Sequence, residues 1–164
     1  MNVSNSVLSG TFLAALVGVI ANARSVSRAS RERERERLRS TLAEAFRAYS
    51  DYKEFPYAVR RRNPSDPAGE RARLSQELRE IQSRLSYYST WLIAESDKIG
   101  SAYQALLIEL RSIAGGSIQS AWLEDSAKTD ADMNIGKERV DLSALKTAEE
   151  AFLKAIKGRV RVKD

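Results

Sequence analysis

The sequence predicts an all-α protein with one N-terminal transmembrane helix, a long antiparallel helical hairpin of coiled-coil type, and a short C-terminal helix. Three observations predict this fold class. Residues 1–23 contain no charged side chain. Apolar residues then recur with four-three spacing over much of the chain, which is the period of helices that pack through one seam. The 164 residues include only 8 Gly and 3 Pro and are 30% charged, a composition typical of helix-rich proteins.

The first predicted element is a membrane anchor over residues 1–23. The uncharged run from Val7 to Ala23 is about as short as a helix that crosses a hydrocarbon core can be. No cation precedes the run, whereas three arginines follow it, at Arg24, Arg28 and Arg31. Positive charge tends to stay on the cytoplasmic side. We therefore expect an uncleaved anchor with its N-terminus outside and residues 24–164 as a cytoplasmic domain.

Two alternatives to the anchor stay open. Ala21-Asn22-Ala23 has the small-x-small form of a signal-peptide cleavage site. A helix buried in the core of a soluble protein is the third interpretation. Within the segment, Gly10, Ala14 and Gly18 fall four residues apart and share one helix face, which predicts a face for self-association. Gly and Ala are also frequent in membrane helices in general, which is the simpler explanation of this pattern.

The first hairpin arm is expected over residues 24–55. Its alternating Arg and Glu residues place opposite charges three apart on a helix, so this stretch is predicted to be a solvated helix. The arginines between Arg24 and Arg39 also suit acidic lipid head groups. An apolar seam runs from Leu38 to Tyr52, and Pro56 is expected to end the helix because a proline disfavours helical backbone in the residue before it.

The loop of the hairpin is predicted over residues 56–65, which hold two of the three prolines. Three consecutive cations lie there, Arg60, Arg61 and Arg62, and are candidates for contacts with phosphate. They support the alternative function, a soluble basic helical bundle that binds nucleic acid. No recognised nucleic-acid-reading motif accompanies them, so nucleic acid is the less favoured partner.

The second arm is expected over residues 66–114. Asp66 and Pro67 form a helix start, with Asp as the N-cap and Pro at the first helical position. Four-three spacing continues from Leu74 and is predicted to stop at Gly115-Gly116. Because this arm is longer than the first, we expect a bend within residues 96–101 or a strongly tilted hairpin.

A partner surface follows from pairing the two arms across the predicted loop. Four apolar residues then lie opposite the charged stretch Arg31 to Arg37, which offers no apolar cover; they are Leu85, Tyr88, Trp91 and Leu92. Leaving them in water forfeits about 1.5 to 3 kcal/mol each, so some cover is expected. The two candidates are the protein's own last helix and the same stripe of a second subunit.

The C-terminal part is predicted to hold two helices, over residues 118–127 and 141–157. Between them the acidic residues from Asp130 to Asp141 have part of the ligand spacing of a calcium loop. The glycine expected at the sixth position is displaced to Gly136, and the last ligand is Asp instead of Glu. The simpler interpretation is an acidic loop that caps the following helix.

The amino-acid composition excludes several classes of catalytic and metal-binding site. The chain has no Cys and no His, which excludes thiolate nucleophiles, imidazole acid–base catalysis and the usual zinc ligands. No recognised catalytic motif or cofactor site is present, so an enzyme is not expected. We therefore predict a membrane-anchored helical interaction or scaffold protein, with a protein partner or self-association.

Overall fold

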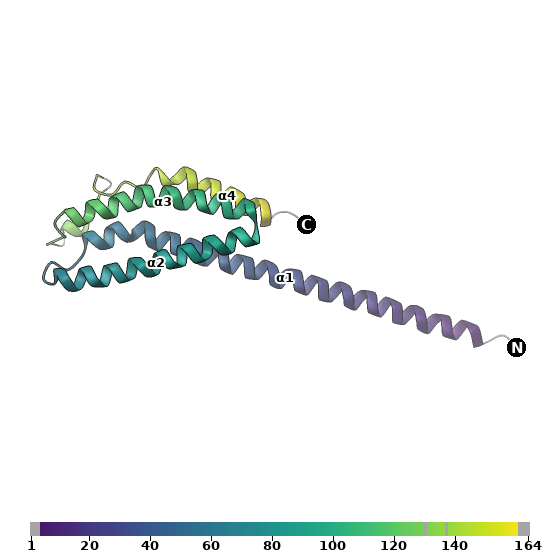
Figure 1. Ribbon diagram of the computed structural model, residues 1–164. Helices are drawn as coiled ribbons and strands as arrows, with labels where there is room; N and C mark the ends of the chain where they lie inside the picture. Colours follow the sequence, from purple (N-terminus) through teal and green to yellow (C-terminus); the bar gives the residue numbers. More distant parts are fainter. Residues whose placement is uncertain (1–3, 130, 137, 161–164) are drawn as a thin grey trace. The chain divides into compact units, whose positions relative to one another are not determined.

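The computed structural model describes the backbone of residues 4–129, 131–136 and 138–160, and the side chains of 29–129, 131–136 and 138–158. Within these residues there are helices and no strand, which confirms the all-α part of the prediction. The helices are α1 (Ser4–Arg60), α2 (Pro67–Glu95), α3 (Asp97–Leu123), the short 3-10 helix η1 (Ala131–Met133) and α4 (Leu145–Val160) (Figure 1). The chain divides into two compact units, Met1–Ser40 and Thr41–Asp164.

The first unit consists of the N-terminal part of α1. Residues 29–37 are exposed, and two of the expected ion pairs form, Glu34 with Arg37 at 2.6 Å and Glu36 with Arg39 at 3.8 Å. Among the described residues no helix is long and apolar enough to cross a membrane. The predicted anchor over 1–23, with Gly10, Ala14 and Gly18, lies outside the residues whose side chains are described.

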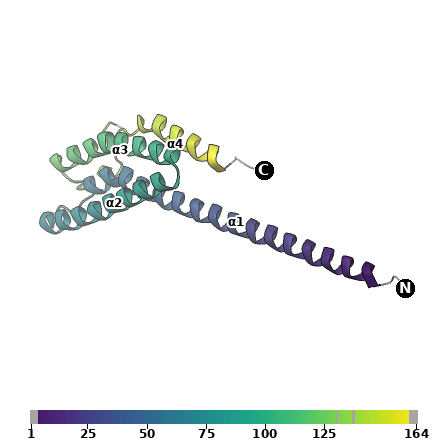
Figure 2. The same ribbon diagram turned by 45° about the vertical axis from the view of Figure 1, so that its right-hand side comes forward.

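The second unit is a four-helix bundle in which successive helices run in opposite directions (Figure 1, Figure 2). It contains α1 from Thr41, then α2, α3 and α4. Tyr103 of α3 lies at the level where three helices meet, because its hydroxyl donates to the Ala45 carbonyl of α1 at 2.9 Å and its ring lies 5.3 Å from that of Phe152 of α4. α3 packs against both α2 and α4.

The bundle core follows the apolar seams of the sequence. The largest fully buried side chains come from α1, α2, α3 and α4, among them Tyr49, Leu85, Leu106, Leu110 and Phe152. On α2 the predicted stripe is confirmed, since Leu74, Ile81, Leu85 and Leu92 are all buried at spacings of seven, four and seven residues. Asp66 caps α2 as expected, its side chain accepting from the Gly69 amide at 2.9 Å.

The expectation that Pro56 ends the first helix is wrong, because α1 continues through Pro56 to Arg60. A proline inside a helix costs about 3 kcal/mol. Here Phe55 and Val59 are almost completely buried on either side of it, and each such burial is worth about 1.5 to 3 kcal/mol. Tertiary packing of the last turn therefore outweighs the local penalty.

The predicted single helix over residues 66–114 is also wrong, because it is two antiparallel helices joined at Ser96. The break lies at the start of the segment 96–101 where a bend was expected. Ser96 is extended, its amide donates to the Leu92 carbonyl at 3.0 Å, and its carbonyl accepts from the Gly100 amide at 2.8 Å. Gly100 allows the reversal, since a Cβ there would lie 2.5 Å from the Ile93 Cα.

The predicted pairing of the two arms is shifted. Arg84 of α2 contacts Asp51 of α1 at 2.8 Å, so the neighbouring Leu85, which is buried, lies at the level of Asp51. Because α1 extends to Arg60, the loop before α2 is shorter than predicted, and different residues of α1 and α2 lie opposite one another. The reversed helix α3 then packs along α2, which is a cover that neither candidate in the sequence prediction included.

The C-terminal boundaries differ from the prediction as well. α3 runs through Gly115 and Gly116 to Leu123, so there is no separate helix over 118–127. Two glycines cost about 1 kcal/mol each in a helix, and the burial of Ala114, Ile118 and Ala121 offsets that cost. The last helix begins at Leu145 and not at 141, because the Asp141 carboxylate accepts from the Ser143 amide at 2.9 Å and holds this segment in a turn.

Candidate functional site

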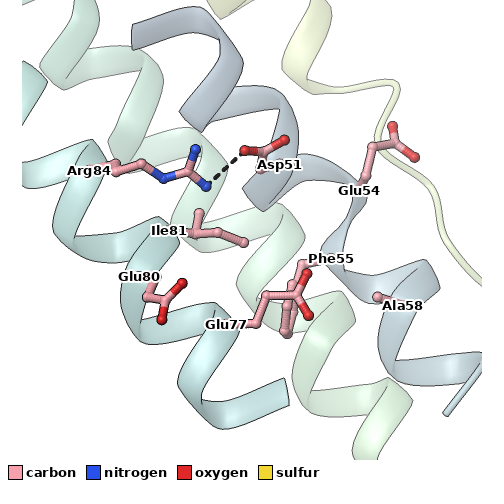
Figure 3. Close-up of a pocket in the computed structure, with 8 residues that line it drawn as sticks. All are labelled: Asp51, Glu54, Phe55, Ala58, Glu77, Glu80, Ile81 and Arg84. Atoms are coloured by element: carbon pink, nitrogen blue, oxygen red, sulfur yellow. Dashed lines mark hydrogen bonds and ion pairs between the residues drawn. The ribbon is translucent and has the colours of Figure 1, made fainter. Parts of the chain in front are cut away.

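A hollow lies on the surface of the bundle between α1 and α2 (Figure 3). We call it the α1–α2 groove, with a volume of about 310 Å³; it is lined by Asp51, Glu54, Phe55, Ala58, Glu77, Glu80, Ile81 and Arg84. Phe55 and Ile81 are 2% and 3% exposed and form an apolar floor. Glu54 precedes the buried Phe55 on α1, and Glu80 precedes the buried Ile81 on α2. Helical spacing therefore places the carboxylates beside the buried seam of each helix.

The rims of the α1–α2 groove are acidic. Asp51 is paired with Arg84 at 2.8 Å, and Glu77 accepts from Arg73 at 3.1 Å. Glu80 accepts from the Gln76 amide at 2.9 Å, a neutral donor that leaves the negative charge in place. Among the described residues Glu54 has no cationic partner, so Glu54 on α1 and Glu80 on α2 present uncompensated charge to a ligand.

A second hollow of about 420 Å³ lies between α2 and α3. Its lining is almost uncharged, with Ser86, Ser89, Thr90 and Gln104 beside Leu107, Ile108 and Arg111. Two of the hydroxyls are used within α2, since Ser86 donates to the Gln82 carbonyl and Thr90 to the Ser86 carbonyl. The exposed Ile108 makes this face partly apolar, and Arg111 is its one charged lining residue.

The three consecutive arginines join the C-terminal end of α1 to the C-terminal end of α3 and to the connector that follows it. Arg60 is 3% exposed, and its guanidinium makes a two-pronged ion pair with Glu124 and donates to the Arg139 carbonyl at 3.0 Å. The hydrogen bonds from Arg60 hold the pKa of the Glu124 carboxyl below its usual range. Arg60 Nε is buried without a hydrogen-bond partner in the part of the chain that the structure describes.

Arg61 and Arg62 make further contacts with the same region. Arg61 donates to the Met133 carbonyl at 3.1 Å, and Arg62 donates to the carbonyls of Ala121 and Glu124 at 2.9 and 2.6 Å. The Arg62 guanidinium also lies 5.3 Å from the ring centre of Trp122. The arginines proposed as phosphate ligands are therefore engaged with the C-terminal end of α3 and the connector that follows it.

A polar cluster joins α4 to α1. Glu149 accepts from the Tyr49 hydroxyl at 2.8 Å and from Lys53 at 2.7 Å. Burial, together with the bond to Glu149, raises the pKa of Tyr49 above its ordinary range. Burial by itself raises the pKa of Glu149, but the bonds from Lys53 and Tyr49 outweigh it and the pKa is lowered. The cluster therefore ties α4 to α1.

The residues proposed as a partner surface divide into two kinds. Leu85 and Leu92 are fully buried in the bundle, whereas Tyr88 and Trp91 are half-buried. Sequence reasoning missed the α1–α2 groove because it assigned the arms the wrong register. The available signal was the helical spacing of Asp51 with Glu54 and of Glu77 with Glu80, which places acidic pairs beside both seams.

Asp132 of the acidic loop proposed as a possible calcium site is engaged in local hydrogen bonds, whereas Asp130, the first proposed ligand, lies outside the described residues. The Asp132 carboxylate accepts from the Thr129 hydroxyl and amide and from the Lys128 amide, at 2.9 to 3.2 Å. The same three donors lower the pKa of Asp132. Over the described residues no three acidic side chains converge in a way that could hold a metal ion.

Comparison with known proteins adds no family assignment. No protein-family model, curated protein or solved structure matches this chain.

Proposed function

We propose that this chain is a membrane-anchored helical protein that acts by binding a protein partner and not by catalysis. The observation that carries the anchoring is the uncharged run over residues 1–23 with arginines directly after it. In this proposal the N-terminus is outside, the bundle is cytoplasmic, and Arg24 to Arg39 lie beside acidic lipid head groups.

The bundle supports the binding part of the proposal. Residues 41–164 form one compact unit whose helices are tied by the Arg60–Glu124 pair and the Tyr49–Glu149–Lys53 cluster. A surface carried on helices fixed in this way is suited to recognition, because little order has to be gained on binding. We do not propose nucleic-acid binding, since Arg60, Arg61 and Arg62 donate to protein carbonyls and to Glu124.

Membrane fractionation of the full chain tests the anchoring. We expect the protein to stay in the membrane pellet through high-salt and alkaline carbonate washes and to be extracted only by detergent. Changing Leu16→Asp together with Val17→Asp should release it, because each charge at the middle of a bilayer costs about 3 kcal/mol. The matched Leu16→Ala, Val17→Ala variant should remain in the pellet. Release of the wild type by salt, or a mature chain beginning at Arg24, contradicts the proposal.

A further inference from the structure

The α1–α2 groove combines features that define the chemistry of a ligand. Its lining has four carboxylates against one guanidinium, a formal excess of three negative charges, in a chain whose net charge is +5. Arg73 compensates Glu77 from the side, which leaves the excess concentrated at Glu54 and Glu80. These two belong to different helices and stand on opposite sides of the apolar floor (Figure 3).

We propose that the α1–α2 groove docks a basic amphipathic segment of a partner protein, with an apolar side chain over Phe55 and Ile81 and Lys or Arg on the rims. This inference rests on the proposed function as an interaction protein and names its partner's chemistry. It follows the helix-in-groove mode of recognition, in which an apolar anchor enters between two helices and flanking charges set the orientation.

Charge complementarity selects this occupant over the others. Nucleic acid and acidic lipid are anionic and are repelled by Glu54 and Glu80. A metal ion needs converging ligands, and among the described residues no such group exists. A wholly apolar partner segment would bury the rim carboxylates without a counter-charge, which is costly. A cationic segment with one apolar side chain can pair its cations with the rim carboxylates and bury the apolar side chain on the floor.

The test uses the full chain in a neutral detergent and a fluorescein-labelled alanine–lysine helical peptide that carries one phenylalanine. Binding is followed by fluorescence anisotropy at low ionic strength, where interactions between exposed charges are strongest. We expect saturable binding by the wild type. Replacing the peptide's phenylalanine by alanine, or its lysines by glutamates, should abolish it, and these two controls need no change in the protein.

Two pairs of charge reversals locate the site. Glu54→Lys with Glu80→Lys should weaken binding by about tenfold or more, because both rims become cationic. Glu109→Lys with Glu150→Lys changes the net charge equally at exposed positions of α3 and α4, and should change affinity by less than about twofold. Ala58→Phe fills the groove without altering charge and should also weaken binding. Thermal unfolding of each variant checks that the bundle is intact.

Three results would overturn the proposal. The first is absence of peptide binding by the wild type. The second is equal weakening by the two double reversals, which would indicate attraction to net charge alone. The third is a self-associated wild type that Glu54→Lys with Glu80→Lys converts to monomer, because the occupant would then be a second copy. None of these results depends on membrane insertion, so the proposed anchoring stands or fails separately by fractionation.

Discussion

Gly100 of α3 lies so close to Ile93 of α2 that a Cβ at position 100 would be 2.5 Å from the Ile93 Cα and 2.7 Å from its amide nitrogen. This contact allows α3 to turn back on α2 directly after Ser96. Because two of the three nearest atoms are backbone atoms of Ile93, which a rotamer change cannot move, Gly100→Ala forces the two helices apart and should destabilise the bundle by about 1 to 3 kcal/mol. Denaturant unfolding measures this change; an unchanged midpoint contradicts the close approach.

Gly116 provides the opposite case within the same helix. No atom lies within 4 Å of a Cβ added at this position, which is exposed in the interior of α3. Alanine there reduces the backbone entropy lost on folding, so Gly116→Ala should stabilise the protein by about 0.5 to 1 kcal/mol. The same unfolding experiment tests it, and a loss of stability would mean that α3 does not continue through the glycine pair.

The Arg60–Glu124 pair should matter more to stability than the ion pairs on the helix surfaces. Arg60 is buried, so Glu124→Gln leaves a guanidinium inside the bundle without its counter-ion. We expect a loss of stability several-fold larger than that of Glu77→Gln, which breaks the exposed i,i+4 pair with Arg73. Equal effects of the two substitutions on the melting temperature would argue against this role.

Glu70 is the clearest source of acid sensitivity at the start of α2. Hydrogen bonds from Arg73 and from the Asn63 amide lower the pKa of Glu70 to about 2, from an ordinary value of 4.5. A carboxyl whose folded pKa is lowered contributes stability that is complete above pH 4.5 and is lost as the pH falls toward 2. Carboxyl NMR should give this midpoint, and Glu70→Gln should flatten the dependence of unfolding on pH in that window. A midpoint near 4.5 in the wild type contradicts the assignment.

The sequence predicted helicity, the start of α2 at Asp66 and the buried stripe of α2, because each depends on local spacing and capping. It did not predict where α1 and α3 end or where the chain reverses between α2 and α3. Pro56 and the pair Gly115-Gly116 are local helix breakers that tertiary burial overrides. Ser96 is the reverse case, since the break depends on a close helix approach at Gly100 that is visible only in three dimensions.

The wrong end predicted for the first helix also explains why the sequence did not predict the α1–α2 groove. If the first helix ends at Pro56, the second arm pairs with Arg31 to Arg37, and its apolar stripe then needs cover from the last helix or from a second subunit. The observed register places Arg84 against Asp51 and opens the acidic groove beside them. The acidic pairs were present in the sequence, but only the register brings those of α1 and α2 to opposite sides of one hollow.

Labelling of single cysteines tests the membrane-anchored orientation most directly, because the natural chain contains no Cys and needs no background substitutions. A membrane-impermeant maleimide is applied to intact cells that produce either Ser4→Cys or Ser75→Cys. We predict labelling of position 4 from outside, and labelling of position 75, which is exposed on α2, only after the membrane is permeabilised. Labelling of position 75 in intact cells, or protection of position 4 until permeabilisation, would contradict the proposed anchor and orientation.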